Sequence, residues 1–103
     1  MAKRPLTLTG KQRRQLKGLA HDLDPIVMVG AKGVTPTLLE AIDQALTDHE
    51  LVKVKLLESC PVPRKEVGPL IAEPLDAHEI GLIGRVLILF RRHPDTPVIP
   101  LKG

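Results

Sequence analysis

Apolar residues recur at helical spacing soon after the start of the chain. Thr9 is suited to a helix N-cap, and Gln12, Leu16, Leu19, Ala20 and Leu23 follow it at intervals of three, four and seven. This stripe predicts a helix over about Gly10–His21. The segment cannot continue as a helix through Asp24-Pro25, because a residue before proline is pushed out of the α region.

A second helical pattern follows Thr35-Pro36, which offers an N-cap and a proline at the first helical position. The pattern predicts a helix that runs to about Asp48. Its buried stripe is expected to consist of Leu38, Leu39, Ile42, Ala45 and Leu46.

Four segments have the patterns of strands. Ile26–Val29 is an unbroken β-prone run that suits a strand covered on both faces. In Leu51–Leu57 apolar residues alternate with Lys53 and Lys55, which predicts one apolar and one basic face. Glu79–Ile83 and Arg85–Phe90 are predicted to form two strands joined across Gly84, the second apolar enough to lie inside a sheet.

Arg64–Asp76 keeps helical spacing, but Gly68-Pro69 and Pro74 oppose an uninterrupted helix and predict a short or distorted one. Prolines at 94, 97 and 100 favour an extended, polyproline-like tail. The predicted order α-β-α-β-α-β-β indicates a single compact layered α/β domain with a mixed sheet. We expect a flexible basic N-terminus over residues 1–8, the folded domain over 9–92 and the extended tail over 93–103.

Composition narrows the class of protein. A chain of 103 residues fits one domain, and with one Phe, no Tyr and no Trp it cannot hold bases on several exposed rings. A single cysteine, Cys60, excludes an internal disulfide and a Cys-rich zinc site, which favours a reducing compartment. No apolar run approaches the ~20 residues of a membrane span, and no signal-peptide pattern follows Met1–Pro5. We therefore expect a cytoplasmic protein that does not contact a membrane.

Positive charge is concentrated at the start of the chain. Residues 1–33 carry a formal charge of +5, whereas residues 34–103 carry −2. A positive electrostatic field of this kind suits a polyanionic partner, although a solvated tail and a polar helix face would give the same distribution of charge. On a helical wheel Lys11, Arg14 and Gly18 point away from the apolar stripe, and Arg13 and Lys17 lie on one flank.

The segment Gly30-Ala31-Lys32-Gly33 is the strongest functional candidate. It joins a predicted strand to a predicted helix, so its glycines permit positive φ, its N–H groups can face a phosphate, and Lys32 adds a charge. A plain turn would have the same sequence. Lys53 and Lys55 would extend a basic track only if their face adjoins this loop, since lysines also mark the solvent face of ordinary strands.

Catalytic motifs are not evident. The glycine segment lacks the spacing of a nucleotide-hydrolysing P-loop and of a dinucleotide fingerprint. The four histidines lack metal-ligand spacing, and Cys60 has no identifiable base. We expect no enzyme, cofactor, metal or small-molecule substrate.

Several segments together resemble the CRM domain (chloroplast RNA splicing and ribosome maturation) and its stand-alone bacterial YhbY-like members. The resemblance rests on 16–21 (Leu-Lys-Gly-Leu-Ala-His), on 30–33, on 50–55 (Glu-Leu-Val-Lys-Val-Lys), on Ile83-Gly84-Arg85 and on Leu89-Phe90-Arg91. It covers nearly the whole chain. It implies a four-stranded sheet packed on helices, similar to the C-terminal domain of a bacterial translation initiation factor.

The resemblance also implies a non-catalytic RNA-binding protein associated with precursors of the large ribosomal subunit. On this hypothesis the protein acts as a monomer and grips the phosphate backbone of ribosomal RNA. The expected contacts are Gly30, Ala31, Lys32 and Gly33, the helix residues Lys11, Arg14, Lys17 and Gly18, and, less directly, Arg13, Lys53 and Lys55. The alternatives are a protein–protein adaptor, a small enzyme acting on a phosphorylated ligand, and a duplex-DNA-binding protein, the last disfavoured by an acidic second helix.

Overall fold

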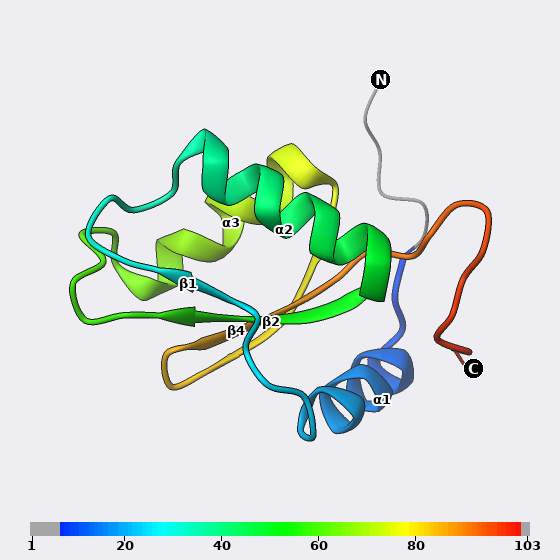
Figure 1. Ribbon diagram of the computed structural model, residues 1–103. Helices are drawn as coiled ribbons and strands as arrows, with labels where there is room; N and C mark the ends of the chain where they lie inside the picture. Colours follow the sequence, from blue (N-terminus) through cyan, green and yellow to red (C-terminus); the bar gives the residue numbers. More distant parts are fainter. Residues whose placement is uncertain (1–6, 102–103) are drawn as a thin grey trace.

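The structure, a computed structural model, describes residues 7–101 and contains the predicted order of elements (Figure 1). Lys3 and Arg4, which contribute to the basic N-terminus, lie outside the described residues. The elements are α1 (Gly10–Ala20), β1 (Val27–Val29), α2 (Pro36–His49), β2 (Leu51–Leu56), α3 (Arg64–Leu75), β3 (His78–Ile83) and β4 (Val86–Phe90).

The four strands form one mixed sheet in the order β1-β2-β4-β3. β1 runs parallel to β2, whereas β4 pairs antiparallel with both β2 and β3. β4 therefore lies inside the sheet, as its apolar sequence predicted. The predicted α/β class and the mixed sheet are confirmed.

Helices cover the two faces of the sheet unequally (Figure 1). α2 and α3 share one face, where Val54, Leu87 and Leu89 join the larger buried cluster with Ile42 and Ile71. α1 lies on the other face, where a smaller buried cluster forms. That cluster consists of Leu8, Leu16, Ala20, Leu51, Ile80, Ile88 and Phe90.

Capping residues set where the first two helices begin. The Thr9 hydroxyl accepts a hydrogen bond from the Gln12 N–H, and the Gln12 side chain accepts one from the Thr9 N–H. The Thr35 hydroxyl caps α2 by accepting a hydrogen bond from the Leu38 N–H, with Pro36 at the first helical position. Both starts agree with the sequence pattern.

The buried stripe of α1 is narrower than predicted. Gln12 belongs to the cap, and only Leu16 and Ala20 are buried. Leu19 and Leu23, which the sequence places on the same apolar stripe, remain 45% and 40% exposed. The reason is geometric: one short helix contacts the sheet along a single line of side chains, and residues on its flank need another element to cover them.

α3 is neither short nor interrupted. It runs as a 12-residue helix through Pro69 and Pro74, both on its exposed side. Val67 and Ile71 are completely buried against the sheet. Packing of this face thus offsets the backbone hydrogen bonds that the two prolines remove.

β1 is an edge strand and is not covered on both faces. Met28, in its centre, is 59% exposed, because α1 covers the sheet only where the smaller cluster lies. The expectation of a fully covered strand is wrong. An unbroken apolar run of this length does not reveal which of its faces a neighbouring helix will reach.

The segment after β4 bends at Pro94 and Asp95 instead of continuing as one extended stretch. The carboxylate of Glu50, a residue 1% exposed, accepts hydrogen bonds from the N–H groups of His93, Val98 and Ile99. Ile99 then packs against the smaller cluster. At the other end of the domain Leu8 is buried, one residue before the predicted start.

Candidate nucleic-acid interface

The segment between β1 and α2 is a tight turn. The Gly33 N–H donates to the Gly30 carbonyl oxygen at 3.0 Å, and Gly33 has a φ of +68°. Ala31 and Lys32 are exposed at the tip. Of the two glycines that could adopt a positive φ, only Gly33 does, and its N–H is already engaged within the turn.

The loop between β2 and α3 packs against this turn. Gly33 is buried, and a Cβ there would lie 3.5 Å from Pro61 and 3.7 Å from Val62. The Leu57 N–H donates to the Val29 carbonyl oxygen at 2.9 Å. The loop between β2 and α3 therefore fixes the turn and leaves only its tip in solvent.

The turn between β3 and β4 lies at the same end of the molecule (Figure 1). Its Arg85 carbonyl oxygen accepts from the Leu56 N–H, and its Gly84 carbonyl oxygen accepts from the Arg64 guanidinium at 2.9 Å. Three connections that are distant in sequence are thus adjacent in space.

These connections gather positive charge. We call this region the basic end; its cations are Lys32, Lys55, Arg64, Lys65 and Arg85. Its acids are Glu58 and Glu66, so the formal charge of the set is +3. Lys32 and Lys55 were expected from the sequence, whereas Arg64, Lys65 and Arg85 were not, because they belong to different segments that only the fold brings together.

Two of the candidate cations have structural partners. The Arg13 guanidinium donates to the Glu79 carbonyl oxygen at 2.8 Å, which fastens α1 to β3. The Lys53 ammonium donates to the Leu23 carbonyl oxygen at 2.9 Å, which holds the connection between α1 and β1. Each of these hydrogen bonds holds its cationic group in one orientation.

The other candidates on α1 are exposed, although the Lys17 side chain lies close to Gly81 of β3. Lys11, Arg14, Lys17 and Gly18 are all exposed, and a Cβ on Gly18 would meet nothing within 4 Å. α1 nevertheless lies well apart from the glycine turn (Figure 1). The structure does not bring Lys11 and Arg14 beside Lys32.

An open strip of the sheet joins the two regions. Lys55 is in register with Met28 on β1 and with Val86 on β4, beyond the area that α1 covers. Next to this row a cavity of about 170 Å³ is lined by Lys17, His21, Lys53, Ile83, Val86 and Ile88. Lys17 lines this cavity and Lys55 is in register with Val86, another of its lining residues, so the two lysines lie on the same face of the sheet.

Other chemistry has little support in the part of the chain that the structure describes. Residues 7–101 contain no group of three or more His, Cys, Asp or Glu side chains that could hold a metal ion. The half-buried Cys60 lies in the loop behind the glycine turn, 3.6 Å from the Val62 carbonyl oxygen. None of the helices traced within these residues is long and apolar enough to cross a membrane.

The fold and the surface define a small α/β domain with a cationic end and no exposed Phe, Tyr or Trp ring among the described residues. Residues 8–91 match the model of the CRS1 / YhbY (CRM) domain. The chain belongs to this family, which confirms the resemblance found in the sequence.

Individual relatives agree along almost their whole length. A Haemophilus influenzae protein named "RNA-binding protein" is 40% identical over 97 residues, which span 93% of this chain and 98% of the relative. The "Probable RNA-binding protein YqeI" of Bacillus subtilis is 33% identical over 94 residues, or 91% and 98% of the two chains. The solution structure of the hypothetical protein SAV1595 from Staphylococcus aureus has a TM-score of 0.78 at 32% identity and covers 93% of this chain and 100% of that one.

Proposed function

We propose that this protein binds structured RNA through the phosphate backbone and takes part in assembly of the large ribosomal subunit. Similarity to relatives named RNA-binding proteins, at up to 40% identity over nearly the full length, carries the proposal. The ribosomal part follows the resemblance to the stand-alone bacterial CRM proteins. No catalytic step is part of the proposal.

The basic end is the surface that suits phosphates best. Lys32 stands at the tip of a turn held by its own backbone hydrogen bond, so the backbone has a defined position while the exposed side chain can reach a phosphate. Lys65 and Arg85 are exposed at the same end of the molecule. Cations presented from several elements can follow a curved backbone without contacting base edges, which is how phosphate contacts position an RNA.

The exposed lysine and arginine side chains of α1 would form a second contact region. Lys17 borders the open strip of the sheet, whereas Lys11 and Arg14 lie farther along the helix. An RNA that reaches both regions must lie across the strip past Lys55. This geometry favours a folded RNA element over a short single strand.

Binding of this kind depends steeply on salt, because each neutralised phosphate releases counterions. Affinity for a large-subunit RNA fragment, measured at low and at physiological salt, should fall on the order of a hundredfold or more if about five phosphates are contacted. An affinity that stays flat over this range would contradict the electrostatic mechanism.

Association with assembly intermediates is tested in a cell lysate. The protein should migrate with immature large-subunit particles in a density gradient and return to the top after nuclease treatment. A complex that survives nuclease would favour the protein–protein adaptor instead.

A further inference from the structure

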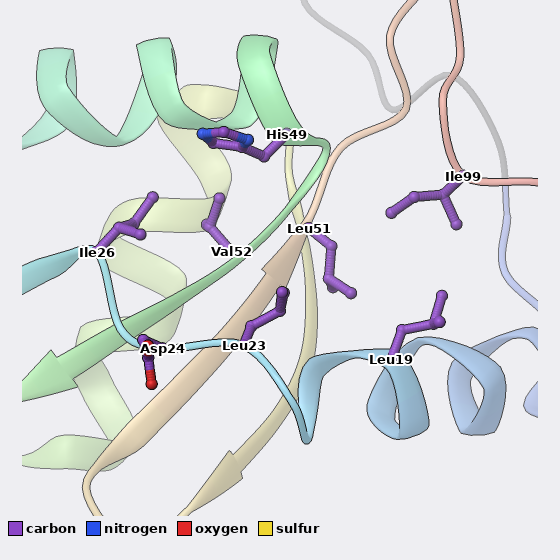
Figure 2. Close-up of a pocket in the computed structure, with 8 residues that line it drawn as sticks. All are labelled: Leu19, Leu23, Asp24, Ile26, His49, Leu51, Val52 and Ile99. Atoms are coloured by element: carbon purple, nitrogen blue, oxygen red, sulfur yellow. The ribbon is translucent and has the colours of Figure 1, made fainter.

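An apolar cleft of about 460 Å³ opens between the C-terminal ends of α1 and α2 (Figure 2). Six of its lining residues are apolar, and Asp24 and His49 add polar groups. The apolar residues come from α1, the following connection, β2 and the C-terminal segment: Leu19, Leu23, Ile26, Leu51, Val52 and Ile99. We call this site the apolar cleft.

Two walls of the cleft are held by hydrogen bonds that do not involve a ligand. The Ile99 wall is fixed because the Ile99 N–H donates to Glu50 Oε1 at 2.8 Å, while Gln15 donates to the Pro100 carbonyl oxygen at 2.7 Å. The Leu23 wall is fixed because the Lys53 ammonium donates a hydrogen bond to the Leu23 carbonyl oxygen. The cleft is therefore preformed, which lowers the entropy lost when a partner binds.

Three of the aliphatic side chains that line the cleft are largely exposed to solvent. Leu19, Leu23 and Ile26 are 45%, 40% and 49% exposed, and all three face the same cleft (Figure 2). A contiguous apolar surface rimmed by polar groups is typical of a protein–protein contact. An apolar side chain of a partner would remove these three residues from water.

The charge around the cleft is opposite to that of the basic end. No lysine or arginine is among its lining residues, whereas Asp24 is. The Lys53 ammonium lies outside the lining and is engaged by the Leu23 carbonyl oxygen. α1 and α2 both terminate here, and a helix C-terminus carries a partial negative charge of about −0.5. Such a rim repels phosphates and attracts ammonium and guanidinium groups.

We propose that the apolar cleft binds a basic polypeptide segment of a partner protein. An apolar side chain of that segment fills the cleft, and a neighbouring lysine or arginine lies beside Asp24 and the helix ends. RNA and the basic partner would use different surfaces of the domain. The inference therefore does not depend on the proposed RNA function.

The test uses a fluorescent amphipathic peptide with leucines on one face and lysines on the other. Its binding to the full chain is measured by fluorescence anisotropy, and the contact is mapped by amide chemical shifts. Two control peptides carry glutamate in place of lysine or serine in place of leucine. We expect binding of the Leu/Lys peptide, weaker binding of both controls, and shifts at Leu19, Leu23 and Ile26.

Variants of the protein distinguish peptide binding in the cleft from nonspecific hydrophobic binding. Leu23→Ser and Asp24→Lys should each lower the affinity for the Leu/Lys peptide on the order of tenfold, as expected for an anchor residue at a contact. Ile83→Ser, at a residue 63% exposed outside the cleft, should leave affinity unchanged. Leu23→Ser should also keep its affinity for RNA, so that failure of this inference is distinguishable from failure of the RNA proposal.

Three outcomes would overturn the inference. The glutamate peptide binds as tightly as the lysine peptide, or the cleft variants bind the peptide like the original chain. Alternatively, an RNA oligonucleotide, or a second copy of the chain at raised concentration, produces the shifts at the cleft residues.

Discussion

Lys53 Nζ lies 2.9 Å from the Leu23 carbonyl oxygen, a contact that joins β2 to the connection between α1 and β1. Lys55, two residues further along the same strand face, is exposed, with no such contact among the described residues. Two lysines that look equivalent in the sequence therefore have different roles.

Replacing each lysine by glutamine should separate these roles. Lys53→Gln removes the contact with Leu23 and should lower the free energy of unfolding by about 0.5–1 kcal/mol, since the site is partly solvated. Lys55→Gln should leave stability unchanged but lower the slope of log affinity against log salt by about 1 if it contacts one phosphate. Urea unfolding and RNA titration at several salt concentrations measure both effects, and identical behaviour of the two variants would contradict the assignment.

The two glycines of the turn should respond differently to alanine. Gly33 has a φ of +68°, so Gly33→Ala should cost about 1–2 kcal/mol of stability. Gly30 does not have a positive φ, and a Cβ there meets Leu57 at an ordinary 3.6 Å, so Gly30→Ala should change stability by less than about 0.5 kcal/mol.

Chemical unfolding and RNA binding, measured for both glycine variants, distinguish a structural role of the turn from direct contact with RNA. If Gly30→Ala loses RNA affinity with stability intact, the backbone at this position approaches the RNA. Loss of affinity only in the destabilised Gly33→Ala protein would instead assign the turn a structural role.

The buried carboxylate of Glu50 should be essential for the C-terminal segment. Glu50→Gln places an amide N–H₂ opposite one of the backbone donors that the carboxylate now satisfies, from His93 or from Val98 and Ile99. We expect a loss of about 2 kcal/mol in the free energy of unfolding. Hydrogen exchange should accelerate at the Val98 and Ile99 amides; protection equal to that of the original chain would show that the segment is held by other contacts.

Charge reversal at the basic end tests the residues that only the fold assembles. Lys65→Glu and Arg85→Glu should each weaken RNA binding on the order of tenfold at low salt, because a favourable phosphate contact becomes a repulsive one. Both side chains are exposed, so thermal stability should change little.

Arg92→Glu provides the matched control for these reversals. Arg92 follows β4 at the end of that strand opposite to the turn with Arg85. The net charge changes equally, but RNA affinity should fall much less. Equal losses at all three positions would indicate a general field effect and not a localised site.

Local sequence determined most of the fold of this protein. Thr9 and Thr35 satisfy backbone donors within their own helix, and the alternation around Val54 distinguishes the two faces of a strand over a few residues. The glycine turn was also identified in this way, since its hydrogen bond joins residues three apart. Information that acts over a few residues can be read along the chain.

The tertiary structure decided what depends on distant neighbours. α3 passes Pro69 and Pro74 because Val67 and Ile71 are buried against strands from other parts of the chain. Met28 stays exposed because α1 covers only part of its face of the sheet, and Leu19 because it lies on a flank of α1 that no other element covers. The basic end and the apolar cleft exist for the same reason: each is assembled from segments separated by tens of residues, and only the packing of the sheet and helices brings them within contact distance.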